Sequence, residues 1–575
     1  MDFIVKFWKL LKRGNVLQYI FICVVFMQLA SMSLDIPWSE IDYKMPQRDA
    51  YYISWVWSWN MEILANNPLN LFEANIYAPF SNTLAFSETF LGTTFMAWPI
   101  LKATGNIALT YNLIIFLSFA ISGMGMYALV YYLTKNKWAS LLAALVYAFN
   151  PFKVAQSAEH LHLVGMWLPF VFLYLHKFFK KQSWKNVLIL LFFVILVFLN
   201  SMHYFIFLPI VIVFFGVIFI SVRAFSFNRG NIIKILLAML LLVMIVLPLI
   251  RPYYQVKNEY GVNTRLIGEV EAHSPDLVDY FIPSPWYEVY SQERGHIEMI
   301  VSPGLVIILL FILAMMALYR SEFFREGNNK RNFVIYGAVG LVAFLISFGY
   351  YIQLTFVDKS GIPGPYILLY YLLPGFNGIR AAGRYSVFLL LSMAVVIGYG
   401  MAWWLKQGKS IFIKLLSVFW VFIFLFTELT FIPTPAYGLI GLTPQERATY
   451  SWIKDQPNTM VFWELPMASP YDLFINYDIN YVFNSRLHFR KIVNGYSGYC
   501  SPGYFELATR FKYFNLDRDI STIREYKTNY MVFHFDYFEK KDEDKDRIIQ
   551  EIEDSGYLDY AINFGNNYIY QVIYD

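Results

Sequence analysis

The sequence has 575 residues, of which 58% are apolar, 20% aromatic and only 15% charged. Because soluble domains carry about 25% charged residues, this composition excludes an ordinary soluble protein and predicts one that uses lipid as its solvent. The formal net charge of +4 on so long a chain gives no indication of a nucleic-acid partner, and the two cysteines, Cys23 and Cys500, offer no metal-ligand spacing.

Long apolar blocks recur along the chain, and about 20 apolar residues in a helix are needed to cross a bilayer. The first block resembles a signal peptide, but its apolar run is long and further spans follow, so we interpret it as an uncleaved anchor. We predict eleven membrane-spanning helices, at residues 15–33, 107–133, 138–150, 163–180, 186–200, 203–222, 232–250, 303–320, 331–350, 380–404 and 411–431.

Two further apolar stretches lie in the first outer loop, residues 34–106, and we expect neither to cross the membrane. Residues 89–104 are short, contain Pro99 and end near Lys102, which favours an interfacial or re-entrant helix. Residues 50–64 are rich in tryptophan, which collects at the depth of the lipid headgroups. Both are therefore predicted to be interfacial helices.

The orientation follows from the basic residues, because cytoplasmic loops are enriched in Lys and Arg. With eleven spans, almost all loop cations fall on one side: Lys6, Lys9, Lys12, Arg13, Lys135, Lys137, Lys177, Lys180, Lys181, Lys185, Arg223, Arg229, Arg320, Arg325, Lys330, Arg331, Lys406 and Lys409. The opposite side has little beyond Lys153 and Lys359. This pattern predicts an integral cell-membrane protein with a cytoplasmic N-terminus and an extracytoplasmic C-terminus.

After residue 431 the composition becomes that of a globular domain. Short strand-like runs alternate with helical patterns, which predicts an extracytoplasmic α/β domain at residues 432–575. The fold class expected is thus a polytopic α-helical membrane domain, residues 1–431 with outer loops 34–106 and 251–302, followed by this α/β domain.

Ionisable residues gather on the predicted outer side, which indicates one aqueous, charged cavity at the outer membrane boundary. Asp49 precedes the tryptophan-rich helix and is a candidate catalytic acid, although it could also be a helix N-cap or a solvated loop acid. Glu88 lies in the same loop. Glu159, His160 and His162 could cap the following span or bind a metal, for which no third ligand is identifiable.

Three arginines, Arg251, Arg380 and Arg384, stand at predicted outer helix ends. Arg380 and Arg384 are four residues apart and would share one face of a helix. They could snorkel to lipid headgroups or clamp a lipid phosphate, for which the guanidinium fork is well suited. We favour the clamp, because outer arginines run against the usual charge bias. His203 is interpreted as packing or lining the cavity.

Several segments resemble the C-type (GT-C) membrane glycosyltransferase superfamily, in its poorly characterised bacterial and archaeal group. These segments are RDAYYISWVWSWNMEIL, NNPLNLFEANIYAPFSNTLAFSE, NPFKVAQSAEHLHLVGMWLPFVFLYL and LPGFNGIRAAGRYSVFLLLSMAVVIGYG, with ELP at 464–466 and NGYSGY at 494–499. The likeness covers most of residues 15–431. Many relatives place Gly before the first-loop acid, where this chain has Arg48.

The resemblance implies transfer of a sugar from a polyprenyl-phosphate donor to a glycan, lipid or protein hydroxyl at the outer membrane face. Asp49 would be the general base, Arg380 and Arg384 would stabilise the leaving phosphate, and Glu88, Glu159 and His160 would orient the sugar. Arg251 and His162 are further candidates for binding the substrate or the donor. No cofactor is identified, and a divalent metal stays an open alternative. The alternatives are a lipid-linked glycan transporter and a non-catalytic scaffold; the absence of an internal sequence repeat favours an enzyme over a transporter.

Overall fold

A computed structural model describes residues 14–157, 164–221, 228–262, 264–282, 300–319, 321–322, 328–355, 361–407, 410–429, 437–468, 477–538 and 540–574. The chain forms two compact units. The helical unit comprises Met1–Asp42, Leu109–Val246 and Arg265–Ala436, and the sheet unit comprises Tyr43–Ala108, Leu247–Thr264 and Tyr437–Asp575. The predicted domain boundary at residue 431 lies outside the described residues.

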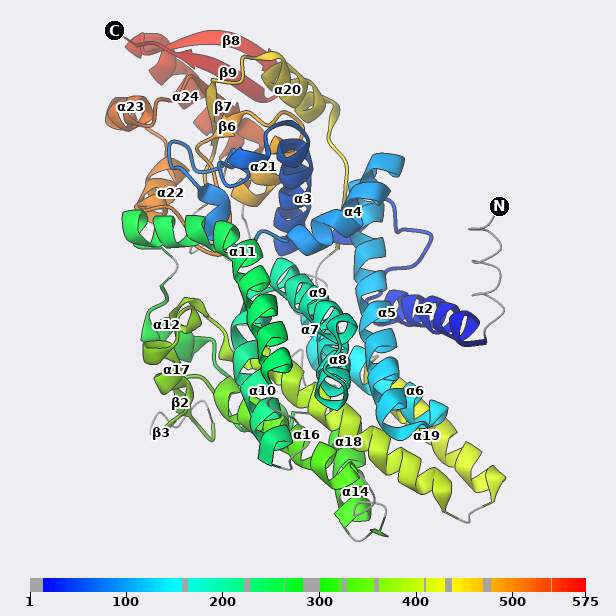
Figure 1. The fold of residues 1–575 in the computed structure, drawn as a ribbon. Coiled ribbons are helices and arrows are strands. Elements are labelled where there is room, and N and C mark those ends of the chain that lie inside the picture. Colours follow the sequence, from blue (N-terminus) through cyan, green and yellow to red (C-terminus); the bar gives the residue numbers. More distant parts are fainter. Residues whose placement is uncertain are drawn as a thin grey trace, which may run out of the picture. The chain divides into compact units, whose positions relative to one another are not determined.

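The helical unit consists mainly of long apolar helices (Figure 1). They are α2 (Gly14–Ser33), α5 (Ile107–Thr134), α6 (Lys137–Ala148), α8 (Leu168–Lys180), α9 (Trp184–Asn200), α10 (Met202–Ser221), α11 (Arg229–Tyr260), α14 (Leu305–Tyr319), α16 (Asn329–Ser347), α18 (Ser386–Lys406) and α19 (Ile411–Leu429), together with the short α7 (Pro151–Ser157). From Leu247 onward, the residues of α11 belong to the sheet unit. Shorter elements are α12 (Ile267–Ala272), η4 (Val278–Tyr280), β2 (Tyr351–Ile352), β3 (Ile362–Pro363), α17 (Tyr366–Leu372), η7 (Phe376–Gly378) and η8 (Ala382–Tyr385).

Every predicted span overlaps one of these helices. Within the described residues, six helices are long and apolar enough to cross a membrane: Ile107–Thr134, Met202–Ser221, Arg229–Tyr260, Asn329–Ser347, Ala382–Lys406 and Phe412–Leu429. Four others are apolar but shorter: Leu17–Ser33, Lys137–Ala148, Trp184–Asn200 and Leu305–Tyr319. The chain is therefore an integral membrane protein, and eleven crossings stay a prediction.

Helix α18 forms the core of the helical unit and packs against α6, α14 and α16. In its apolar window 83% of the residues are buried inside the protein. Gly400 of α18 lies against Ala314 of α14, where an added Cβ would collide with the Ala314 side chain. By contrast, only 6% of the α11 window is buried, so most of that helix is available to face lipid.

The predicted orientation can be tested with a reporter enzyme that is active only outside the cytoplasm. Fused after Asp575 it should be active, and fused at Lys137 or Lys406 it should be silent, because the cytoplasmic loops carry the lysines. Helix α4 (Leu91–Thr104) is 14 residues long and contains Pro99, which is short for a crossing. Activity of the Lys137 fusion would contradict this, since it would require residues 89–104 to cross.

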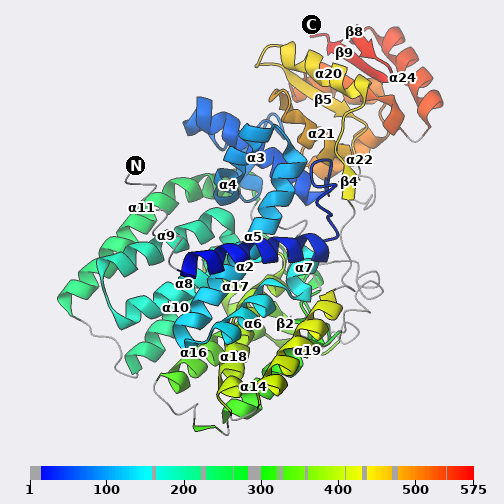
Figure 2. The same ribbon diagram turned by 90° about the vertical axis from the view of Figure 1, so that its right-hand side faces the viewer.

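The sheet unit contains a mixed five-stranded sheet with strand order β6-β5-β7-β9-β8 in the described residues. Its strands are β5 (Val461–Leu465), β6 (Lys491–Ile492), β7 (Tyr530–His534), β8 (Leu558–Phe564) and β9 (Asn567–Val572). Strands β6, β5 and β7 are parallel, whereas β9 is antiparallel to β7 and β8. Helices α20 (Pro444–Asp455) and α24 (Lys541–Ser555) lie beside the sheet (Figure 2).

The first-loop elements are β1 (Lys44–Pro46), α3 (Asp49–Asn66), η1 (Pro68–Asn70), η2 (Thr83–Phe86) and α4. They pack with the C-terminal segment, because β1 pairs with β4 (Tyr437–Leu439) and α3 lies beside α21 (Tyr477–Ser485). The Tyr51 and Phe483 rings stack at 4.4 Å between these two helices. The first loop and the C-terminal segment thus form one folded body, a pairing of distant segments that the sequence does not indicate.

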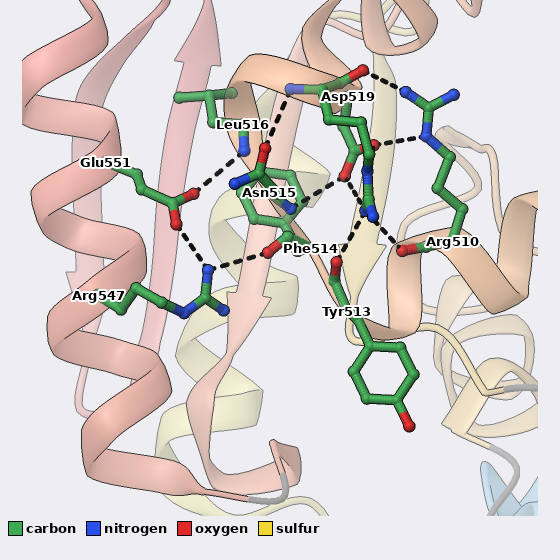
Figure 3. A network of polar contacts seen from close by, with 9 residues as sticks. Arg510, Tyr513, Phe514, Asn515, Leu516, Asp519, Arg547 and Glu551 are labelled. Atoms are coloured by element: carbon green, nitrogen blue, oxygen red, sulfur yellow. Dashed lines mark hydrogen bonds and ion pairs between the residues drawn. The ribbon is translucent and has the colours of Figure 1, made fainter.

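Charged side chains join the helices at one end of this unit (Figure 3). The Asp519 carboxylate is fully buried and accepts from Arg510 Nε at 2.6 Å and Arg518 Nε at 2.8 Å. Arg547 Nη1 donates to Glu551 Oε1 at 2.7 Å. The Asp519 contacts connect α22 (Tyr504–Lys512) with α23 (Leu516–Glu525), and Leu516 N donates to Glu551 Oε2 at 3.1 Å, which connects α23 with α24. Because the buried carboxylate is matched by two guanidinium groups, we interpret this network as structural.

Candidate functional site

Asp49 is the first residue of α3, and Arg48 rather than Asp49 occupies the N-cap position. Arg48 has φ 54° and ψ −116°, a backbone conformation that glycine adopts far more easily than a residue with a Cβ. This explains why Gly would suit the position before the acid, and it places a strained residue beside Asp49. Asp49 lies in the first turn of α3, where the helix dipole favours a negative charge.

A tyrosine from the C-terminal segment holds the Asp49 carboxylate. The Tyr496 hydroxyl donates to Asp49 Oδ1 at 2.6 Å, across 447 residues of sequence. The Tyr496 ring also lies 6.0 Å from the ring of Tyr52, on the next turn of α3. Both Asp49 and Tyr496 are half-buried. The carboxylate is therefore oriented by the fold and remains partly accessible to solvent.

Glu88 lies in the same neighbourhood and is only 9% exposed. Burial raises the pKa of Tyr52, and the carboxylates of Asp49 and Glu88 act in the same direction, which places both acids near the Tyr52 hydroxyl. The Tyr52 hydroxyl is thus a hydrogen-bond donor at neutral pH. From α11, the Tyr253 hydroxyl donates to the backbone oxygen of Ser87 at 2.8 Å. We name Asp49, Tyr52, Glu88, Tyr253 and Tyr496 the carboxylate cluster; all five belong to the sheet unit.

This arrangement is suited to a hydroxyl-bearing ligand. Carboxylates accept hydrogen bonds from sugar hydroxyls, tyrosine hydroxyls both donate and accept, and aromatic rings supply apolar faces. A carboxylate that is oriented and partly accessible can also take a proton from a bound hydroxyl.

The arginines are arranged differently from the prediction. Helix α18 begins at Ser386, so Arg380 lies in a bend and Arg384 in the 3-10 helix η8. The expectation that both share one face of a continuous helix was wrong, because the chain bends before the long helix starts. Helix α11 continues to Tyr260, so Arg251 lies within it rather than at its end, and it is exposed.

In the helical unit, Arg384 is only 8% exposed, and its Nη1 lies 2.9 Å from His203 Nε2 at the start of α10. Residues close to His203 and Arg384 in the sequence also carry buried polar atoms: among the described residues, the hydroxyls of Ser201 and Tyr385 and the amide oxygen of Asn200 have no hydrogen-bond partner. A buried guanidinium group beside an imidazole is suited to an anionic group. We name Asn200, Ser201, His203, Arg384 and Tyr385 the arginine cluster.

Glu159, His160 and His162 lie outside the described residues. Within the part of the chain that is described, no three His, Cys, Asp or Glu side chains gather into a group that could hold a metal ion. A metal ion bound by Glu159, His160 and His162 therefore stays a prediction from the sequence.

The sheet contains a buried pair of ionisable residues, His534 and Glu464, which differs from the carboxylate cluster in being fully enclosed. His534 Nε2 lies 2.9 Å from Glu464 Oε2, and the two side chains are 2% and 0% exposed. The other ring nitrogen, Nδ1, lies 3.0 Å from Asn567 Oδ1. Because the pair is enclosed within the sheet, we interpret it as a packing element of the sheet unit.

Three site residues were not predicted from the sequence: Tyr52, Tyr253 and Tyr496. His203 was predicted only to pack or to line the cavity. Tyr52 follows Asp49 by three residues, which places both on one face of a helix. Tyr496 belongs to the NGYSGY motif, so the sequence marked this residue but did not indicate that it bonds to Asp49. Nothing in the local sequence marks Tyr253.

No protein-family model matches the chain, and no curated protein matches it. The cryo-EM structure of arabinofuranosyltransferase AftD from Mycobacteria aligns with 97% of this chain, at a TM-score of 0.57 and 12% identity, and the chain spans 40% of the AftD chain. Looser likenesses are oligosaccharyltransferase AglB from Archaeoglobus fulgidus, in complex with an inhibitory peptide and a dolichol-phosphate (TM-score 0.46, 12% identity, 91% of this chain and 70% of that chain), and ArnT from Cupriavidus metallidurans (0.37, 11%, 97% and 97%). The likeness to AftD supports the fold.

Proposed function

Starting from its GT-C glycosyltransferase fold, we propose that the chain transfers a sugar from a polyprenyl-phosphate donor to a hydroxyl acceptor at the outer membrane face. Fold by itself does not define activity, so the proposal is carried by one observation, the hydrogen bond that orients the half-buried Asp49 carboxylate at the start of α3.

In the proposed reaction, the acceptor oxygen forms a bond to the anomeric carbon while the bond from that carbon to the donor phosphate oxygen breaks. The acceptor proton passes to Asp49, which acts as the general base. Glu88 and Tyr52 bind hydroxyls of the sugar or the acceptor, because they supply an acceptor and a donor beside Asp49. The electron pair leaves with the polyprenyl phosphate.

The arginine cluster is assigned the donor phosphate. Negative charge grows on this phosphate as the sugar departs, and a fixed guanidinium group stabilises growing charge more than it stabilises the ground state. Arg384 is buried and held near His203, so it is the principal phosphate ligand. Arg380, in the bend before η8, is assigned a supporting contact.

The test uses the full chain purified in detergent with a panel of polyprenyl-phosphate donors carrying arabinofuranose, mannose or glucose. We expect release of free polyprenyl phosphate from at least one donor in the presence of a glycan or lipid acceptor. The same protein in proteoliposomes distinguishes the transferase from the alternative, a lipid-linked glycan transporter. Movement of an intact donor between leaflets, with no release of polyprenyl phosphate, would identify a transporter and overturn the proposal.

A further inference from the structure

The NGYSGY motif, residues 494–499, is fixed at its first residue by hydrogen bonds from two elements of the sheet unit. Asn494 Oδ1 accepts from Glu464 N of β5 at 2.8 Å, and Asn494 Nδ2 donates to Glu464 O at 2.9 Å. The same amide donates to Asp478 Oδ1 of α21 at 2.8 Å. The motif thus starts from a fixed point on the sheet, and the ELP and NGYSGY motifs are directly connected.

From this point the motif runs along the first outer loop. The backbone N–H of Tyr77 donates to the Asn494 oxygen at 3.1 Å, and the N–H of Tyr499 donates to the Phe86 oxygen at 2.9 Å. Gly495 lies so close to the Tyr77 ring that an added Cβ would collide with it. At Gly498, an added Cβ would lie 3.3 Å from Ser87 Oγ. Tyr496 lies between these two attachments, so its position relative to Asp49 is set by both.

We infer that Tyr496 is a positioning residue for the Asp49 base and that the C-terminal segment thereby completes the catalytic machinery of the first loop. The inference rests on the proposed function, and its observation is the 2.6 Å hydrogen bond from the Tyr496 hydroxyl to Asp49 Oδ1. This distance is typical of an O–H donor bound to a charged carboxylate.

The hydrogen bond has two consequences for a general base. It restricts rotation of the carboxyl group, which keeps the accepting oxygen in one orientation toward a bound hydroxyl. It also favours the ionised form of Asp49, the form that can accept a proton. Without the donor, the carboxyl group would rotate more freely and would hold its proton to a higher pH.

The carboxylate cluster contains further polar groups. The carboxylates of Asp49 and Glu88 both raise the pKa of Tyr52 in the first loop, and the Tyr253 hydroxyl of α11 donates to the backbone oxygen of Ser87. Glu88 is negative when ionised, and it therefore opposes ionisation of Asp49. Tyr496, from the C-terminal segment, counters this repulsion with a hydrogen bond, so its loss should be visible in the titration of Asp49.

The experiment replaces Tyr496→Phe in the full-length protein, which keeps the ring and removes the hydroxyl. With the donor that the panel identifies, kcat should fall about tenfold at neutral pH with little change in KM, and the acid limb of the pH profile should move up by about one pH unit. The matched control is Tyr513→Phe, since Tyr513 is in the same unit and 61% exposed. It should behave as wild type.

Two further measurements separate positioning from a structural role. If Tyr496 acts through Asp49, adding Tyr496→Phe to Asp49→Asn should cause no further loss, whereas independent defects would multiply. Without any turnover assay, the pH at which Asp49 becomes reactive toward a carbodiimide, followed by peptide mass spectrometry, should also rise by about one unit in Tyr496→Phe.

The outcomes distinguish the inference from the proposed function. Wild-type turnover and an unshifted Asp49 titration in Tyr496→Phe, with an inactive Asp49→Asn variant, would overturn the inference and leave the proposed function standing. Full activity of Asp49→Asn would overturn the inference and remove Asp49 as the base of the proposed reaction, because there would then be no base for Tyr496 to position. Multiplying losses in the double variant would assign Tyr496 to folding.

Discussion

Replacing Asp49→Asn should lower turnover by at least about a hundredfold, because loss of a general base costs about 10²–10⁴-fold in rate. The variant keeps the shape of the side chain and an oxygen to accept from Tyr496. Its structural cost should be small: a carboxylate in the first turn of a helix contributes only about 0.3–1 kcal/mol through the helix dipole. We would measure the rate of polyprenyl-phosphate release together with the amount of folded protein. A large loss of rate without a loss of folded protein would show that Asp49 acts as the base and has no essential structural role.

The control is Glu62→Gln on the same helix, where the carboxylate accepts from Asn66 and faces solvent. It should leave turnover unchanged. Wild-type turnover in Asp49→Asn would remove this residue from the mechanism and make Glu88 the next candidate base within the carboxylate cluster.

Replacing Arg384→Ala should weaken use of the donor by about 10- to 100-fold in kcat/KM, the range expected when a hydrogen bond to a charged group is lost. The Arg380→Ala and Arg384→Ala double variant should be weaker still. Arg384→Lys should rescue only partly, because a point charge lacks the planar fork of the guanidinium group. The measurement is the dependence of rate on donor concentration at saturating acceptor.

Because Arg384 is buried, each variant needs a check of folded protein in detergent by size-exclusion chromatography. Arg229→Ala, at the exposed start of α11, is the matched control and should bind the donor normally. An unchanged donor dependence in a folded double variant would return these arginines to a structural role at the membrane boundary.

Much of the local structure follows from the sequence. A membrane-spanning helix needs a continuous apolar run, which is a property of neighbouring residues, and every predicted span overlaps a helix in the structure. The tryptophan-rich stretch at 50–64 and the stretch at 89–104 also form helices, as α3 and α4. Helix ends were less predictable, since α11 extends beyond Arg251 and α18 starts after Arg384.

By itself, the sequence determined that this is a membrane protein with an acidic residue at the start of a tryptophan-rich helix, and it singled out NGYSGY. Only the tertiary structure decided that Tyr496 of that motif donates to Asp49 and that Tyr253 of α11 donates to the backbone oxygen of Ser87. It also decided that Arg384 lies beside His203. The reason is physical. Helix formation depends on residues within a few turns, whereas each of these contacts joins segments that meet only when its own unit folds.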